Sequence, residues 1–191
     1  MRRKIDLHLH TDASDGTWSN IALLQNIRSN NVSIFSITDH DTITNSVAMS
    51  KLELPVGVKF IVGVEFSTFY LGVRYHILAY NFDFSNLSFQ EILKFNTNAT
   101  EIWFENIMEY ACKKYTCISM SDYREYENDP QRGGCKPINF LLDRKIIRRA
   151  SVFFEIIKER FSHSTVVKSN RRMIQSHKSL ISLFKSPSMN L

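Results

Sequence analysis

The sequence has few cysteines and no long hydrophobic run, and both absences exclude classes of protein. Its three cysteines, Cys112, Cys117 and Cys135, are odd in number and lack Cys-x-x-Cys spacing. They argue against a disulfide framework and a zinc finger, and they fit a reducing cytoplasm. No stretch approaches the roughly 20 consecutive apolar residues that span a bilayer. The basic start, residues 1–4, does not lead into a signal-peptide core. We therefore expect a cytoplasmic protein without a membrane partner.

The composition is that of a globular protein with an uneven charge. With 191 residues, 43% of them hydrophobic, the chain can form one domain with a substantial core. The net charge of +5 hides two regions: residues 1–143 hold 13 basic and 17 acidic groups, and residues 144–191 hold 11 and 2. The carboxylate-rich front suits cation binding. The basic end suits either nucleic acid or a plainly solvated surface.

Strands and helices alternate over the first 80 residues. Residues 5–10 read Ile-Asp-Leu-His-Leu-His, which predicts a strand with both histidines on the face opposite the apolar side chains. Ser19 is expected to cap a helix in which Ile21, Leu24 and Ile27 recur at helical spacing. Further predicted elements are strands at 32–38, 59–66 and 73–80 and a short helix that ends near residue 51. This order indicates an α/β fold with a largely parallel sheet or barrel, a class that carries its chemistry at the C-terminal ends of strands.

The pattern becomes helical beyond residue 86. Ser88 and Glu91 form a capping box that opens a long helix to about Tyr115, with a break expected at residues 96–98. Two more helices are predicted over residues 137–142 and 152–161. The resulting domain division is a β/α metal-site region at 1–85, a helical insertion at 86–161 and a basic tail at 162–191.

Four of the six histidines fall in the first 80 residues, near the ends of predicted strands, where polar residues have no packing reason to gather. A lone His-x-His is often a core pair with satisfied hydrogen bonds, but here carboxylates accompany it. The candidate metal ligands are His8, His10, Asp15, His40, Glu65 and His76. Imidazole and carboxylate together suit Mn, Fe or Zn, whereas Mg and Ca favour an all-oxygen set.

Five short motifs around these residues resemble the successive motifs of the PHP (polymerase and histidinol phosphatase) domain family. They are His8-Leu9-His10-Thr11, Ser14-Asp15-Gly16, Thr38-Asp39-His40-Asp41, Gly63-Val64-Glu65-Phe66-Ser67 and His76-Ile77-Leu78-Ala79-Tyr80. Over roughly residues 4–160 the chain is most similar to the small phosphatase branch that acts on nucleotides and on RNA 5′ ends. The resemblance implies a distorted (β/α)7 barrel, incomplete here, with a helical insertion after the fourth strand.

The same resemblance implies a site for up to three Mn, Fe or Zn ions. The six candidate residues would be its ligands, with Glu65 bridging two ions and with Asp15, His40 and Glu65 in catalytic roles. The expected reaction is hydrolysis of phosphate esters of nucleotides or short RNA 5′ ends by a metal-activated hydroxide.

Two pairs of residues near this site have open roles. Asp39 and Asp41 either orient His40 or cap the following helix. Arg132 and Lys136 lie in a basic, glycine-containing turn before a helix, where donors can hold a phosphate. We therefore predict that these two basic residues bind substrate, with an exposed surface loop as the alternative.

The sequence departs from the family pattern after residue 161. It lacks the late Ala-His-Pro-like motif and the Asp-x-His pair, and His163 and His177 sit in polar, basic surroundings that do not favour metal binding. We therefore expect a C-terminally truncated barrel with an open edge, capable of self-association.

Three other functions compete with hydrolysis. The chain could be a non-catalytic remnant that binds metal or nucleic acid. A polymerase-associated proofreading module is disfavoured because no polymerase follows. An amidohydrolase would need a bridging lysine or a late aspartate that the sequence does not offer.

Overall fold

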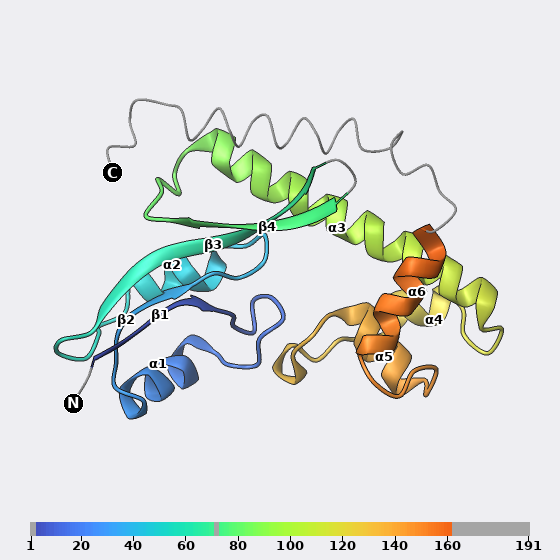
Figure 1. Ribbon diagram of the computed structural model, residues 1–191, viewed down its shortest axis with the longest axis horizontal. Helices are drawn as coiled ribbons and strands as arrows, with labels where there is room; N and C mark the ends of the chain where they lie inside the picture. Colours follow the sequence, from blue (N-terminus) through green and yellow to red (C-terminus); the bar gives the residue numbers. More distant parts are fainter. Residues whose placement is uncertain (1–2, 71–72, 162–191) are drawn as a thin grey trace.

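The computed structural model describes residues 3–70 and 73–161, which form a curled four-stranded half-barrel followed by a helical region (Figure 1). The half-barrel consists of β1 (Lys4–Leu9), α1 (Asn20–Ser29), β2 (Val32–Ile37), α2 (Thr44–Ser50), β3 (Lys59–Tyr70) and β4 (Val73–Tyr80). The helical region consists of α3 (Leu87–Lys114), α4 (Met120–Glu125), a 3-10 turn (Pro130–Arg132), α5 (Lys136–Asp143) and α6 (Ser151–Phe161). The α/β class is confirmed. The predicted tail 162–191, with His163 and His177, lies outside the described residues.

The sheet has the order β1-β2-β3-β4, and only its first three strands are parallel. β4 runs antiparallel to β3. The two strands are joined by a two-residue connection, which is too short for a parallel crossover. The hydroxyl of Tyr80, in β4, donates to the carbonyl of Leu7, in β1, at 2.8 Å, so the two edge strands approach each other across the inner face. This contact is a direct sign of the curl.

α1 and α2 cover the outer face of the parallel strands. Their shared core contains Leu23, Ile27, Phe35, Ile37 and Met49. Ser19 caps α1 as predicted, with its side chain accepting from the Ala22 N–H. Of the predicted apolar face, Ile27 is buried and Leu24 packs against the same core. The prediction was wrong at Ile21, which is 69% exposed, because Leu23 faces the sheet in its place.

α3 is a single 28-residue helix, about 42 Å long at 1.5 Å per residue. Its N-cap is Asn86, whose side chain accepts from the Phe89 N–H, so the predicted Ser88 capping box was wrong. The predicted break at residues 96–98 was also wrong. Asn96 is buried within the helix, where its amide finds partners on the half-barrel.

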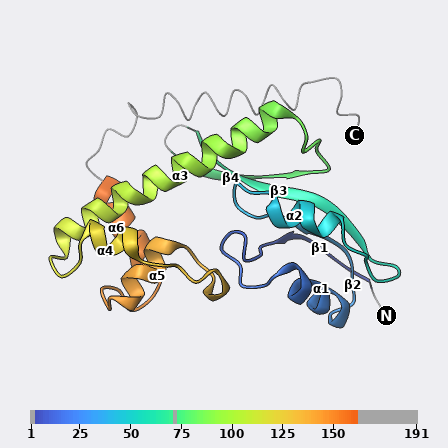
Figure 2. The same cartoon turned by 180° about the vertical axis from the view of Figure 1, so that it is seen from behind.

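α3 joins two separate hydrophobic cores (Figures 1 and 2). Its first half packs on β3 and β4 through Phe89, Ile92 and Leu93. Its second half, from Ile107 onward, packs against α4, α5 and α6. The predicted helices at 137–142 and 152–161 are confirmed by α5 and α6.

The β1 edge is open in the described part of the chain, where β1 pairs only with β2. On this strand Ile5 is 62% exposed and Leu7 37% exposed. Among the described residues, no helix combines the length and the apolar character needed to cross a membrane.

Candidate metal centre

The six candidate ligands meet at one end of the half-barrel, on its inner face. His8 lies in β1, His10 and Asp15 in the loop after it, His40 just beyond β2, Glu65 in β3 and His76 in β4. Side chains alternate along β3, so Val64 and Phe66 pack in the core beneath α3 while Glu65 points inward. His76 lies within β4, as predicted, opposite Ser67. The strand runs antiparallel to β3, however, whereas a largely parallel sheet was predicted.

Glu65 is the centre of the group. One carboxylate oxygen, Oε2, lies 2.9 Å from His8 Nε2 and 3.0 Å from His10 Nε2. The other, Oε1, lies 2.6 Å from His76 Nδ1. Glu65 is only 4% exposed, so a buried carboxylate is surrounded by three imidazoles.

Asp15 forms a second focus beside the first. Its Oδ1 lies 2.9 Å from His10 Nδ1, and its Oδ2 lies 3.7 Å from His40 Nε2. The other nitrogen of His40 lies 3.7 Å from Glu65 Oε2. His10 and His40 therefore each face both carboxylates and connect the two foci.

Donor atoms in this group fall into three overlapping sets, each with all atoms within 4.8 Å of one another. The sets are His8 with His10 and Glu65, His10 with Asp15 and His40, and His40 with Glu65 and His76. Because the sets share His10, His40 and Glu65, they form one continuous constellation.

The residues present fit a divalent cation. His40 Nδ1 is buried and has no hydrogen-bond partner among the described residues, which is costly for a polar atom unless a ligand satisfies it. The donors are imidazoles and carboxylates without a thiolate, a set that suits Mn, Fe or Zn.

The carboxylates are held in their ionised form. A hydrogen bond from His10 lowers the pKa of Asp15 to about 2. Burial by itself raises the pKa of Glu65, but hydrogen bonds from His8 and His76, with nearby imidazole charge, bring it below its ordinary value. Both carboxylates are therefore negative at neutral pH.

The two central imidazoles differ in pKa. Burial by itself lowers the pKa of His10, but the hydrogen bond and charge of Asp15 outweigh it, so this pKa is raised. Burial dominates at His40, and its pKa is lowered. His40 is accordingly neutral at pH 7, as a ligand nitrogen must be.

Asp39 and Asp41 neither hydrogen-bond to the His40 ring nor cap the following helix, so the predicted direct contacts were wrong. Asp39 accepts hydrogen bonds from Thr11 N (2.7 Å), Thr11 Oγ1 (2.6 Å) and Ser14 Oγ (2.6 Å), which secures the loop that carries Asp15. Asp41 accepts from the Ser67 N–H at 2.9 Å and from an amide of α3. Within residues 3–70 and 73–161, no hydrogen bond joins either carboxylate to His40, and α2 begins after Ile43 without a side-chain cap.

The turn that carries Arg132 contacts the metal-site loop through its backbone. Gly134 N–H donates to the Asp15 carbonyl at 2.9 Å. Gly133 has a φ of +72°, and a side chain there would come within 2.8 Å of Thr17 Cγ2. A left-handed conformation and a close approach together explain glycine at this position.

The predicted substrate-binding side chains are engaged within the helical region. Arg132 Nη1 lies 2.6 Å from Asp143 Oδ1. Lys136 Nζ donates to the Arg124 carbonyl at 3.1 Å and lies over the Tyr123 ring. Their roles in substrate binding remain predictions.

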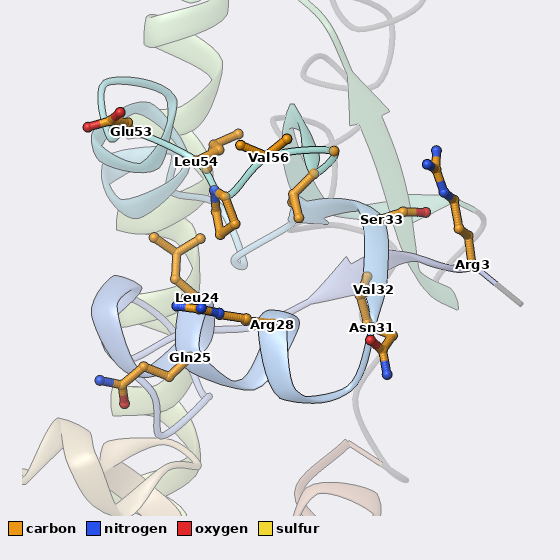
Figure 3. A pocket seen from close by; sticks show the side chains of 13 residues that line it. Arg3, Leu24, Gln25, Arg28, Asn31, Val32, Ser33, Glu53, Leu54 and Val56 are labelled. Carbon is orange, nitrogen blue, oxygen red and sulfur yellow. The ribbon is translucent and has the colours of Figure 1, made fainter. Parts of the chain in front are cut away.

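A surface hollow of about 950 Å³ lies at the opposite end of the parallel strands (Figure 3). Leu24 and Arg28 of α1 line one side, and Leu54 and Val56 of the α2–β3 connection line another. None of the six candidate ligands lines this hollow, so the chemistry is not expected there.

Sequence reasoning missed two features of the site. The sequence around Asn96 predicts a helix break, although a polar residue on an otherwise apolar helix face also signals a buried contact. Thr11 and Ser14 were seen only as parts of motifs. Their partner, Asp39, lies more than 20 residues away, so nothing local could have paired them.

Comparison with known proteins agrees with this geometry. The family model of the PHP domain matches residues 6–161, most of the chain. The chain belongs to the PHP domain family.

Curated PHP relatives include two exoribonucleases. The chain is 39% identical over 83 residues to a 5′-3′ exoribonuclease of Haemophilus influenzae, covering 44% of this chain and 30% of that enzyme. It is 37% identical over 84 residues to the 5′-3′ exoribonuclease Rnm of Escherichia coli, covering 42% and 28%. The chain thus spans less than a third of the length of these relatives.

Two solved structures share the fold of this PHP chain. A protein of Bifidobacterium adolescentis predicted to be a metal-dependent phosphoesterase aligns with a TM-score of 0.67 and 21% identity, over 86% of this chain and 58% of its own. An amidohydrolase of Chromobacterium violaceum aligns with a TM-score of 0.61 and 20% identity, over 80% and 54%. At these identities the likeness concerns the fold alone.

Proposed function

We propose that this PHP protein binds divalent cations through the six clustered residues and hydrolyses phosphate esters of nucleotides or of short RNA 5′ ends. The observation that carries the proposal is the constellation around Glu65, in which a buried carboxylate faces three imidazoles and His40 Nδ1 lacks a hydrogen-bond partner among the described residues. The proposed ligands are His8, His10, Asp15, His40, Glu65 and His76.

Divalent cations at such a site supply positive charge to phosphoryl oxygens and lower the pKa of a water toward about 7. Asp15 and Glu65 contribute the negative charge that retains them, since both carboxylates have lowered pKa values. His40 contributes a neutral nitrogen, since burial lowers its pKa. These three residues are the proposed catalytic group.

The exoribonuclease relatives support RNA or a nucleotide as the substrate class, although they match this chain over less than half of its length. Arg132 and Lys136 are the proposed phosphate contacts. The Gly134–Asp15 contact supports this role, because it brings the turn of Arg132 against the metal-site loop. Arg132 would exchange its ion pair with Asp143 for one with phosphate.

The test is metal content followed by turnover. Protein stripped with a chelator is incubated with Mn, Fe or Zn, freed of excess metal and measured by elemental analysis. Phosphate or nucleotide release is then followed with nucleoside monophosphates and 5′-phosphorylated oligoribonucleotides. We expect bound metal and metal-dependent release in the wild type, and loss of both in Glu65→Gln. A wild-type protein that retains no metal would contradict the proposal.

A second candidate is metal binding without hydrolysis. The open β1 edge favours it, because the described half-barrel surrounds the site on fewer sides than a closed barrel would. Full metal content with no turnover on any of these substrates would select this second candidate.

A further inference from the structure

α3 buries one amide side chain against the strands of the metal centre. Asn96 lies in the middle of this helix and is only 5% exposed. Its Nδ2 donates to Asp41 Oδ1 at 2.9 Å and to the Ser67 carbonyl at 3.0 Å. Burial of an amide is unfavourable unless it is hydrogen-bonded, and here both N–H groups have acceptors.

Asp41 is anchored from several directions at once. Its carboxylate also accepts from the Ser67 N–H, and its own N–H donates to the Glu65 carbonyl, both at 2.9 Å. Thr97, the neighbour of Asn96 in α3, donates from its hydroxyl to the Asp41 carbonyl at 3.3 Å. Asp41 has a φ of +52°, a left-handed conformation that needs such surrounding contacts to persist.

His40 depends on this anchoring more than the other imidazoles do. A metal-binding histidine is usually oriented by a hydrogen bond from its second ring nitrogen. Across residues 3–70 and 73–161, neither ring nitrogen of His40 makes such a bond: Nδ1 has no hydrogen-bond partner, and Nε2 lies 3.7 Å from Asp15 Oδ2. The backbone on both sides is held instead, because the Glu65 N–H donates to the Asp39 carbonyl at 3.2 Å and Asp41 is fixed as described. These backbone contacts therefore position His40, a role that a side-chain hydrogen bond plays for other metal-binding histidines.

We propose that Asn96 is a positioning residue of the metal centre. By binding Asp41 and Ser67 it holds the backbone that presents His40, so α3 of the helical region sets the geometry of this ligand through the backbone. The inference rests on the proposed metal function, and its test lets the two fail separately.

The experiment compares Asn96→Ala with Asn98→Ala in the full chain. Asn98 is an exposed asparagine two residues further along α3, so its variant is a matched control. Mn affinity is measured by isothermal titration calorimetry on protein shown by circular dichroism to be folded. We expect Asn96→Ala to weaken Mn binding by about 10- to 100-fold, the range for losing a group that orients a ligand. Asn98→Ala should bind like the wild type.

A second measurement does not depend on metal. Imidazole nitrogen resonances of the metal-free protein report the ring environment of His40, and we expect them to move in Asn96→Ala and to stay in place in Asn98→Ala. If Asn96→Ala does not fold, Thr97→Val replaces it, since it removes the hydroxyl that donates to the Asp41 carbonyl and, within α3, to the Leu93 carbonyl. We expect a smaller effect in the same direction.

The outcomes separate the two proposals. If the wild type binds Mn and the folded variant binds it equally well, the positioning role is overturned and the metal site stands. If the wild type binds no Mn, the proposed function fails. The His40 resonances then test the positioning role by themselves: unchanged resonances in the variant overturn the inference, and shifted resonances support it. As a further check, the exchange of Asp41→Asn with Asn96→Asp should recover part of the loss seen in Asn96→Asp alone.

Discussion

The half-barrel and the helical region bury different kinds of side chain. Of the eleven buried polar or charged residues in the described chain, nine lie before residue 70. By contrast, the core of α3 to α6 is built from apolar and aromatic residues that are at most 6% exposed. The half-barrel therefore buries most of the polar side chains, including those of the metal centre, whereas the core of the helical region is apolar.

The two buried polar residues of the helical region lie where it meets the metal centre. Asn96 binds Asp41, next to His40. Asn139 donates to the Gly133 carbonyl at 2.9 Å and so supports the turn that contacts Asp15. Polar burial in this region therefore occurs where the region meets the site.

The largest expected effect is loss of the metal centre in the double variant His8→Ala with His10→Ala. The variant lacks two of the imidazoles that lie beside the Glu65 carboxylate. Loss of a group that only orients a ligand lowers metal affinity roughly 10–100-fold, and we expect Mn affinity to fall by more than that here. Elemental analysis after gel filtration measures it. A variant with the wild-type metal content would remove these histidines from the site.

In the helical core we expect a substitution to lower stability without changing Mn affinity. Ile107 is fully buried there, and Ile107→Ala should lower the free energy of unfolding by about 2–5 kcal/mol. Because the residue lies in the second core, Mn affinity of the folded variant should not change. Urea unfolding and calorimetry together measure this, with the exposed Ile102→Ala as control. A large loss of affinity would show that the two regions are not separable in this way.

Arg132→Ala tests whether the helical region contributes a substrate contact where it meets the half-barrel. If its guanidinium contacts phosphate, its loss should raise KM about tenfold, as expected for one charge-assisted hydrogen bond, with little change in kcat. Steady-state kinetics on a nucleotide substrate measure both. Arg124→Ala, which removes an exposed arginine paired with Glu105, is the matched control. A fall in kcat at constant KM would exclude the phosphate-contact role.

The smallest effect concerns the pH dependence of stability without metal. The pKa of Asp15 is about 2 in the folded protein and 3.8 ordinarily. The stabilisation that Asp15 contributes to the folded state is therefore present above pH 3.8 and is lost as the pH falls toward 2. The pKa of His10 in the folded protein is raised above 6.5. The stabilisation that His10 contributes to the folded state is therefore present below pH 6.5 and is lost as the pH rises through the folded-state pKa.

The ion pair should therefore stabilise the metal-free protein most between about pH 4 and 6.5. We expect a contribution of no more than about 1 kcal/mol, since Asp15 is 45% exposed and water screens the pair. Thermal unfolding of the wild type and of Asp15→Asn across pH 3 to 8, with chelator present, gives the difference. A difference that does not vary with pH would contradict the pair.

The sequence by itself determined the local elements and the membership of the cluster. Helix ends at Ser19, residue 51 and Tyr115 follow from capping and spacing, which act within a few residues. The six candidate ligands were indicated by polar residues that gather near strand ends and by the resemblance of their motifs to the PHP family. The structure brings these six together, as expected for an α/β fold.

Only the tertiary structure decided the partners of the remaining polar residues. The pairing of Asp39 with Thr11 and the burial of Asn96 against Asp41 join residues distant in sequence, and the partner of Arg132, Asp143, lies in another helix. A side chain that can hydrogen-bond has many possible acceptors, and its sequence neighbours do not select among them. The choice is made when α3 packs on the half-barrel and brings one particular amide against one particular carboxylate.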